Sequence, residues 1–212
     1  MKVEVIKAKS APIDYRLMTK YAVDFTLGDG SVSLRGGISG AMKIAHTESQ
    51  KEYLYYKADK LAALTDVSIY YYDTLPSKPR YSLQTKSHTI YTDIYNKMYP
   101  LGKKALYPNF VNQMDWESIA YLYMDDGSIC DNGCGTPVLR LSTQSFSYAD
   151  NVLLQTKLQE LGCPVNIRKD TRPNGNVFWY LRLPTKAISF FIDNIKPFIN
   201  PCCQYKLFSG VR

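Results

Sequence analysis

Hydrophobic positions in the first half of the chain change their spacing in a regular order. Alternation at every second residue is typical of half-buried strands, and spacing of three to four residues is typical of amphipathic helices. The order predicts a buried helix, two strands, a helix, two strands and a short closing helix, over residues 18–28, 31–35, 38–45, 50–64, 67–72, 80–86 and 89–98.

The second half repeats this order, which we detect by sliding the chain against itself by 97 residues. Asp29-Gly30-Ser31 then falls on Asp126-Gly127-Ser128. The corresponding elements are a helix over 116–125, alternation over 139–142, a helix over 149–161, strands at 165–168 and 176–183 around a turn at 172–175, and a helix over 185–199.

The repeat predicts an α+β fold of two pseudo-symmetric αββαββα units that pack through the helices ending at the Asp-Gly pairs. We assign residues 1–14 to an N-terminal segment, 15–110 to the first repeat and 111–212 to the second. In each repeat the antiparallel sheet has one apolar face and one polar, basic face.

Composition excludes several classes of protein. The chain has 212 residues and a net charge of +7, and its 45 % apolar and 13 % aromatic content excludes a disordered protein. Apolar runs fall short of the roughly 20 residues of a membrane span, and no signal peptide begins the chain, so we expect an intracellular protein. The five cysteines, at 130, 134, 163, 202 and 203, are poorly spaced for zinc or disulfides and are interpreted as buried or bystander thiols.

The outward positions of the predicted strands carry cations, amides and aromatics with almost no acid. An ordinary solvated face is one interpretation, and a nucleic-acid surface is the sharper one, because Arg and Lys contact phosphates while Arg, Gln and Asn read base edges. The set that we expect to contact DNA is Ser33, Arg35, Lys43, Tyr70, Tyr72, Arg80, Ser82, Gln84, Lys86, Arg140, Ser142, Arg168, Lys169, Arg172, Asn176, Tyr180 and Arg182.

Asp29 and Asp126 each follow or close an apolar helix. If the halves pack through these helices, the two carboxylates meet at one end of the pair and form a Mg²⁺ site, because hard oxygen ligands suit this ion. A calcium-loop interpretation of residues 125–128 fails, since the alternating oxygen ligands and the closing Glu are missing.

At these residues the sequence resembles the LAGLIDADG homing endonucleases. The signature helix is matched by Ala22-Val23-Asp24-Phe25-Thr26-Leu27-Gly28-Asp29-Gly30 and by Ile119-Ala120-Tyr121-Leu122-Tyr123-Met124-Asp125-Asp126-Gly127. Family-like stretches also occur at residues 46–57, 102–104, 141–146 and 205–207, and the two-motif layout is similar to the monomeric branch of the family.

The resemblance implies roles for individual residues. Asp29 and Asp126 would bind divalent ions, Mg²⁺ or Mn²⁺, with Gly28 and Asp125 beside them, and each half would cut one DNA strand. Lys206, and Lys104 in preference to Lys103, would support the reacting phosphate, and Gln144 would orient solvent. Asp24 and Tyr121 depart from the family pattern, because small residues are usual at those positions, and a buried Asp24 would need a partner or solvent.

The resemblance therefore implies a site-specific, Mg²⁺-dependent double-strand DNA endonuclease, monomeric and independent of membranes, that binds a long target on a saddle of two sheets. An RNA-binding intron maturase is the alternative, since the basic face suits RNA as well. A degenerate DNA-binding regulator is disfavoured because both aspartates are present. We expect the protein in a bacterial or phage-infected cytoplasm or in an organelle matrix.

Overall fold

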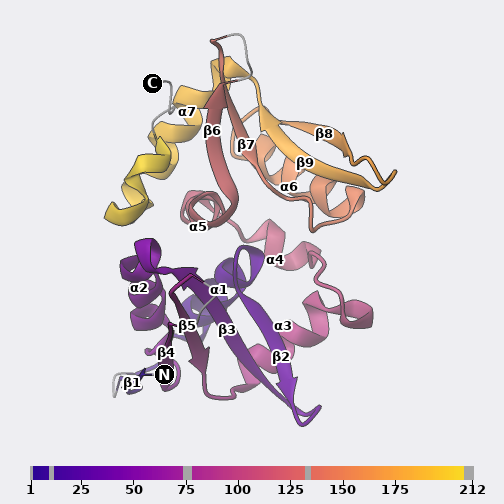
Figure 1. Cartoon of the computed structure of the whole chain (residues 1–212). Coiled ribbons are helices and arrows are strands. Elements are labelled where there is room, and N and C mark those ends of the chain that lie inside the picture. Colours follow the sequence, from indigo (N-terminus) through magenta and orange to yellow (C-terminus); the bar gives the residue numbers. More distant parts are fainter. Residues whose placement is uncertain (1, 10–11, 74–77, 132–134, 208–212) are drawn as a thin grey trace. The chain divides into compact units, whose positions relative to one another are not determined.

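The computed structural model describes residues 2–9, 12–73, 78–131 and 135–207. The chain divides into two compact units, Met1–Tyr99 and Pro100–Arg212. Each unit contains one antiparallel sheet with helices packed against it (Figure 1). The predicted α+β class with two antiparallel sheets is confirmed. The structural division falls after Tyr99, and the assignment of residues 100–110 to the first repeat stays a prediction.

The described residues of unit 1 form three α-helices and a sheet with strand order β1-β4-β5-β3-β2. In its first helix the Asp14 side chain accepts a hydrogen bond from the backbone N–H of Leu17 at 3.0 Å, so the helix begins three residues before the predicted start. The elements are β1 Lys2–Ile6, α1 Tyr15–Leu27, β2 Ser31–Arg35, β3 Ser39–Thr47, α2 Lys51–Leu61, β4 Val67–Tyr72, β5 Arg80–Thr85 and α3 Thr89–Met98, with a 3₁₀ turn at Glu48–Gln50.

The strand β1 is a fifth strand that the hydrophobic pattern did not predict. It pairs antiparallel with β4, from Lys2 opposite Tyr71 to Ile6 opposite Val67. After β1 the chain is held at Ala8, whose backbone N–H donates to the Asp66 carboxylate at 2.7 Å. Charged residues interrupt the apolar positions of β1, and a strand at the edge of a sheet needs little burial, so its sequence carries a weak signal.

Unit 2 contains a four-stranded sheet with order β6-β7-β9-β8. Its elements are α4 Pro108–Asn112, α5 Trp116–Asp126, β6 Gly127–Asp131, β7 Pro137–Leu141, α6 Tyr148–Glu160, β8 Asn166–Thr171, β9 Val177–Leu183 and α7 Thr185–Ile195, with 3₁₀ segments at Pro100–Gly102, Lys196–Phe198 and Pro201–Leu207. The predicted helix over 185–199 ends early because Pro197 has no N–H to continue the α-helical hydrogen bonds, and the chain tightens into a 3₁₀ turn.

The core of each unit lies between the apolar face of its sheet and the helices. In unit 1, α2 and α3 pack against β3, where Ile44 is fully buried. In unit 2, α6 packs against β8 and β9, and α7 packs against β7. Leu181 and Leu183 are buried as the alternation predicts, whereas Val177 at the start of β9 is exposed.

Among the described residues, no helix is both long and apolar enough to cross a membrane. Cys134 lies outside the described residues. Cys163 and Cys203 are buried, and burial raises the pKa of their thiols to about 11 and about 12 respectively. These two thiols therefore carry little of the reactive thiolate form.

Candidate functional site

The end of α1 presents Asp29 to solvent. The helix ends at Leu27, Gly28 caps it, and the Asp29 side chain retains 39 % of its exposure. The backbone N–H of Gly30 donates to the carbonyl of Phe25 at 2.9 Å. A Cβ at Gly30 would lie 2.3 Å from that carbonyl oxygen, so the tight turn that places Asp29 requires glycine at the next position.

A buried histidine contacts Asp29. His46, on β3, is 4 % exposed, and its Nδ1 lies 3.5 Å from an Asp29 carboxylate oxygen. Its other ring nitrogen, Nε2, lies 3.2 Å from Nζ of Lys57, a fully buried side chain on α2. Neither side chain is among the predicted site residues. His46 and Lys57 both fall in the family-like stretch 46–57, which was the available signal, but alternation and helical spacing mark both simply as core positions.

The end of α5 carries two neighbouring aspartates, and its local structure differs from that of the end of α1. Asp126 is the last residue of the helix and is half-buried, as is Asp125. The backbone carbonyl of Asp126 accepts from the N–H of Ser142 at 2.8 Å, which joins the helix end to the end of β7. A Cβ at Gly127 would overlap the Tyr123 ring at 2.0 Å, so glycine is again required after the aspartate.

Lys206 supports the end of α5 through the backbone. Its Nζ donates to the carbonyl oxygens of Met124 and Asp125, the latter at 3.1 Å. The Tyr123 hydroxyl in turn donates to the carbonyl of Lys206. A cation at this position offsets the partial negative charge of a helix C-terminus. Lys104, the predicted counterpart, is half-buried between the 3₁₀ turn at Pro100–Gly102 and α4.

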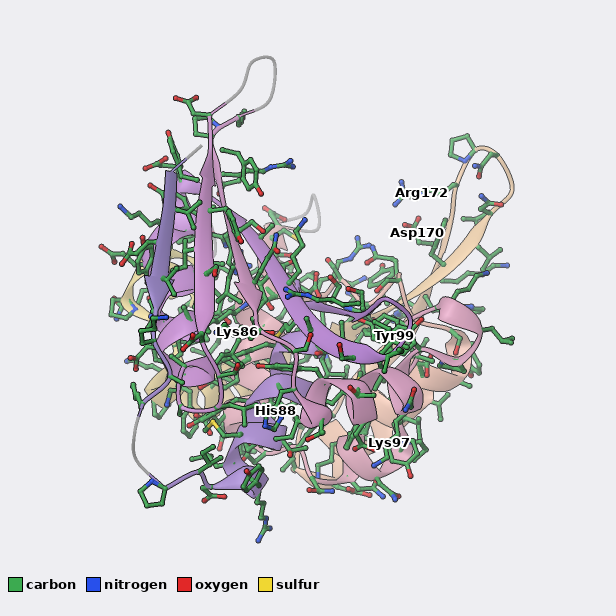
Figure 2. All side chains as sticks on the ribbon, turned by 90° about the horizontal axis from the view of Figure 1, so that it is seen from below. Lys86, His88, Lys97, Tyr99, Asp170 and Arg172 are labelled. Carbon is green, nitrogen blue, oxygen red and sulfur yellow. The ribbon has the colours of Figure 1, made fainter. Side chains whose placement is uncertain are left out.

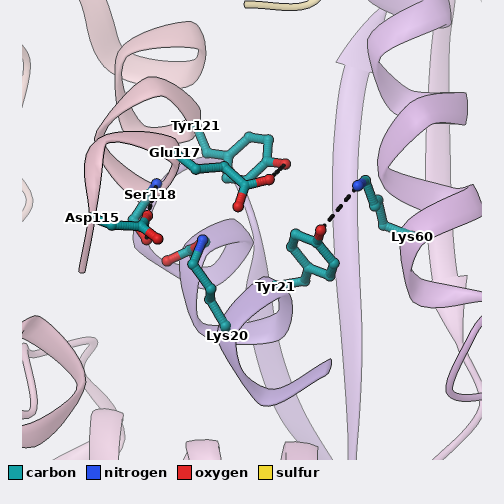
Figure 3. Close-up of polar contacts among 8 residues, drawn as sticks. Lys20, Tyr21, Lys60, Asp115, Glu117, Ser118 and Tyr121 are labelled. Atoms are coloured by element: carbon teal, nitrogen blue, oxygen red, sulfur yellow. Dashed lines mark hydrogen bonds and ion pairs between the residues drawn. The ribbon is translucent and has the colours of Figure 1, made fainter. Parts of the chain in front are cut away.

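The polar residues within α1 and α5 have partners inside their own units (Figure 3). Asp24 is 2 % exposed and pairs with Lys20, one turn earlier on α1, at 3.0 Å. This pair supplies the partner that a buried aspartate requires. The Tyr121 hydroxyl donates to Glu117 at 2.8 Å on α5. The bulky and charged departures from the family pattern are therefore satisfied locally.

The polar face of the unit 1 sheet is continuous across β2, β3, β5 and β4. Gln84, on β5, lies opposite Lys43 on the neighbouring strand β3 and opposite Ser68 on its other neighbour, β4. Arg80 lies opposite Tyr72, with its guanidinium carbon 5.6 Å from the ring centre. The predicted DNA-contact residues that share this face are Ser33, Arg35, Lys43, Tyr70, Tyr72, Arg80, Ser82 and Gln84.

Two cations of unit 1 have protein partners. Arg35 donates to the carbonyl of Thr85 at 2.9 Å. Lys86 follows the end of β5 and pairs with Asp66 at 2.9 Å. The backbone N–H of Ala8 and the Lys86 ammonium hold the pKa of Asp66 at about 2. The stable Asp66 anion beside Lys86 therefore weakens the attraction of this lysine for a phosphate.

The polar face of the unit 2 sheet centres on Arg140. The register places Arg140 opposite Arg182, and Arg182 opposite Asn166. The Arg140 guanidinium carbon lies 3.8 Å from the Tyr180 ring centre. The Gln144 amide lies between that guanidinium and the Ser142 carbonyl, and the amide orientation that satisfies both accepts from Arg140 and donates to Ser142 at 3.1 Å. Stacking and hydrogen bonding thus hold Arg140 and Gln144 in fixed positions.

This face also contains an acid, contrary to the expectation of an almost acid-free surface. Asp170 lies opposite Phe178 on the same side of the sheet as Arg168, and its carboxylate lies 4.0 Å from Arg140 and 3.5 Å from Arg172. Figure 2 shows Asp170 and Arg172 beside the hairpin formed by β8 and β9. Alternation along β8 is weak in sequence, because charged residues occupy both of its faces, and this hid the position of Asp170.

The remaining predicted contacts fall into two groups. Lys169 lies opposite Trp179, on the other side of the sheet from Arg168 and Tyr180. Asn176 is exposed in the turn before β9, and its carbonyl accepts from the Arg172 N–H at 2.9 Å. Lys169 therefore does not share the face that the other predicted contacts of β8 and β9 occupy.

The chain matches a protein-family model, that of the LAGLIDADG DNA endonuclease family, over residues 25–191. An uncharacterized protein of Methanocaldococcus jannaschii, MJ1098, is 28 % identical over 97 % of this chain and 85 % of its own length. The DNA endonuclease I-ChuI of Chlamydomonas applanata is 22 % identical over 87 % of this chain and 91 % of its own length.

Solved structures show the same fold. The homing endonuclease I-WcaI, bound to its DNA recognition sequence, has a TM-score of 0.73 and 20 % identity, and covers 95 % of this chain and 90 % of its own. I-DmoI in complex with DNA and Mn has a TM-score of 0.53 and 18 % identity, and covers 84 % of this chain and 95 % of its own.

Proposed function

Because this chain belongs to the LAGLIDADG DNA endonuclease family, we propose that it is a site-specific homing endonuclease that hydrolyses one phosphodiester bond in each strand of a long DNA target. The observation that carries the proposal is the pair of Asp-Gly helix ends, at Asp29 and Asp126, each within a unit that also presents a polar, basic sheet face. Among the proteins named above, I-ChuI is a DNA endonuclease and I-WcaI is bound to its DNA recognition sequence, which supports DNA as the partner.

The two aspartates fit a divalent cation on electrostatic grounds. A carboxylate at a helix C-terminus sits where the helix dipole is negative, so its charge gains nothing from the helix and favours a bound cation. The Asp29 side chain is 39 % exposed, so its carboxylate is accessible to ions from solvent, and Asp126 is half-buried. Mg²⁺ is usually held by one or two carboxylates together with waters and phosphate oxygens, which matches this donor set.

We assign Asp29 and Asp126 as the principal ligands, with the Gly28 carbonyl and Asp125 as neighbouring donors. When bound, Mg²⁺ or Mn²⁺ lowers the pKa of water and neutralises charge on the phosphate. Lys206 holds the end of α5 in place by donating to two backbone carbonyls, which brings its positive charge to the helix end that carries Asp125 and Asp126. Gln144 is held by Arg140 and Ser142, and its fixed amide can orient water at the unit 2 site.

The sheet faces supply target binding. Lys43, Arg80 and Gln84 in unit 1 present two cations and an amide on one surface. Arg140, Arg168 and Arg182 present three cations on one face of the sheet in unit 2. Cations attract the backbone phosphates, and arginine and glutamine side chains can read guanine and adenine edges in the major groove. We propose that each face takes one half of the target and that a single chain suffices.

Cleavage-site selection from a randomised DNA library in Mg²⁺ tests this function. We expect cleavage in both strands at one recurrent sequence, and loss of double-strand cleavage by about a thousandfold in Asp29→Asn or Asp126→Asn, because each removes a charged metal ligand worth several kcal/mol. Asp193→Asn, an exposed carboxylate on α7, is the matched control. Full cleavage by Asp126→Asn would refute the site assignment.

The same preparation separates DNA cleavage from the maturase alternative. A protein that binds a structured intron RNA more tightly than any duplex in the selected pool, and cuts no DNA, would favour the maturase function. A protein that binds duplex DNA at the arginine-bearing faces and cuts it would exclude an exclusively RNA-directed role.

A further inference from the structure

A lysine occupies the core of unit 1 directly behind the site. Lys57 lies on the buried side of α2, fully excluded from solvent, with Nζ 4.2 Å from the Tyr53 ring centre and 5.5 Å from that of Phe25. Burying an ammonium group costs free energy unless aromatic rings and hydrogen-bond acceptors surround it. An apolar residue at position 57 would be buried at a lower cost in free energy, so the presence of a lysine calls for an explanation beyond packing.

The direction of its hydrogen bond constrains the neighbouring histidine. An ammonium group carries donors and no acceptor, so at a separation of 3.2 Å it donates to Nε2 of His46. In a neutral imidazole the other nitrogen then carries the proton. That nitrogen, Nδ1, lies 3.5 Å from the Asp29 carboxylate, at the outer limit of a hydrogen bond. Catalytic hydrogen bonds are often this long before substrate binds.

The second unit does not repeat this chain of groups. Leu154 stands 97 residues after Lys57, and Gln144 stands 98 residues after His46. Gln144 is held by Arg140, on the sheet face, and its amide offers both a donor and an acceptor. An amide needs no tautomer to be selected, whereas an imidazole does, so a buried cation is required where the histidine occurs.

We propose that Lys57 and His46 are positioning residues for Asp29: Lys57 selects the Nδ1–H tautomer of His46, and His46 holds the Asp29 carboxylate in the orientation that binds the divalent ion. Carboxylates that ligate a metal are oriented by hydrogen bonds from outer groups, and here those groups are a histidine and, behind it, a buried lysine. This inference rests on the proposed function for its metal, but the tautomer itself is a property of the protein alone.

The tautomer can be read directly because the chain has two histidines. Long-range ¹H–¹⁵N spectra of the metal-free protein at pH 8, above the ordinary imidazole pKa of about 6.5, should show His46 with a protonated Nδ1. His88 should show the opposite form, because its Nδ1 accepts from the N–H of Ile90 at 3.2 Å. Its pKa is lowered by burial, so it too is neutral at pH 8. An Nε2–H form of His46 would overturn the proposal.

Lys57→Met tests the role of the cation. Methionine keeps the length and apolar character of the stem, so we expect the fold to be retained. We expect loss of the Nδ1–H preference of His46, and a 10- to 100-fold loss in both Mn²⁺ affinity by calorimetry and single-turnover cleavage rate. DNA affinity measured in Ca²⁺ should not change. Lys60→Met is the matched control, since Lys60 lies on the same helix and donates to Tyr21 at 2.9 Å (Figure 3).

His46→Gln and His46→Leu separate positioning from packing. Glutamine restores a donor toward Asp29 and should recover most of the Mn²⁺ affinity, whereas leucine should not. Equal losses in both variants would show a packing role alone and overturn the proposal. If the wild-type protein cuts no DNA, the proposed function fails, but the His46 tautomer and the Mn²⁺ affinities still decide this inference. If Lys57→Met does not fold, the His46 tautomer of the wild-type protein and the His46 variants still decide it.

Discussion

The ends of α1 and α5 contain the same three residues, Asp-Gly-Ser, in different local structures. Asp29 stands outside its helix, beyond a glycine cap, where a histidine contacts it. Asp126 is the last residue of its helix, and its carbonyl is tied to the strand that follows. The shared glycine, at positions 30 and 127, is required by close approach in both cases.

The cations behind the two aspartates also differ in origin. In unit 1 the cation is Lys57, buried on α2, and it reaches the carboxylate through an imidazole. In unit 2 it is Lys206, on the 3₁₀ segment at Pro201–Leu207, and it binds backbone carbonyls at the helix end. The repeat thus fixes where each carboxylate stands, while the groups that support it are supplied separately in each unit.

Among these substitutions, Lys206→Met should have the largest effect, and it should act on the unit 2 site. It removes the donor to two carbonyls of α5 and the positive charge beside Asp125, so we expect about a 100-fold slower cleavage of one strand. We also expect a loss of about 1–2 kcal/mol in the free energy of unfolding, since carbonyls lose a charged partner. Single-turnover reactions on a target labelled in each strand, with urea denaturation alongside, measure both effects.

Lys57→Met in the same assay should slow the other strand and leave the free energy of unfolding nearly unchanged. Lys196→Met, an exposed lysine of unit 2, is the control for loss of charge. If Lys206→Met and Lys57→Met slow the same strand equally, the units do not support separate cleavage events.

The two sheet faces differ in charge as well. Among the described strand residues, the polar face of unit 1 has no acid, whereas Asp170 lies on that of unit 2, 4.0 Å from Arg140 and 3.5 Å from Arg172. An anion beside two arginines lowers their attraction for phosphates at any sequence. It can also accept a hydrogen bond from a cytosine amino group. We therefore propose that the face of unit 2 contributes selectivity for the target rather than the greatest affinity.

Arg140→Ala should weaken binding of the target by about 1–3 kcal/mol, and Arg80→Ala in unit 1 by less, because Arg140 is held by stacking and hydrogen bonds while Arg80 is exposed. Asp170→Asn should act in the opposite direction, with tighter binding to random duplex DNA and a steeper dependence on salt. Fluorescence anisotropy at several salt concentrations distinguishes them. Weaker binding to random DNA by Asp170→Asn would contradict the selectivity of this face.

Much of this fold could be predicted from spacing. The order of helices and strands in both units follows the periodicities, because burial of one face imposes a period that sequence displays directly. The edge strand β1 escaped prediction, since an edge needs little burial and its residues, such as Glu4, look like a charged terminus. The short helix α4 is below the length at which spacing is informative.

The residues of the proposed site can be selected from sequence where the position of a single residue marks it. Asp29 and Asp126 stand out by their place at helix ends, and Lys206 by its motif. His46 and Lys57 did not, because their role depends on which side chains β3 and α2 bring together, and the spacing of each marks a core position. Asp170 was missed because charged residues occupy both faces of β8, so alternation does not show which face Asp170 is on, and its partner Arg140 comes from another strand, β7.

The smallest expected effect concerns β1, the additional edge strand of unit 1. Asp66 ties Ala8 and Lys86 together at the end of β1, and its pKa is about 2 rather than 3.8. A carboxyl whose pKa is lowered on folding stabilises the protein above its unfolded pKa, and that contribution is lost as the pH falls through about 2.

Asp66→Asn should therefore lower the urea midpoint slightly and by a constant amount from pH 8 to about pH 5. The difference from wild type should shrink below about pH 4, as Asp66 takes up its proton in the unfolded chain. Asp193→Asn is the control, and a midpoint difference that stays constant down to pH 2 would show that the charge of Asp66 does not hold the β1 edge.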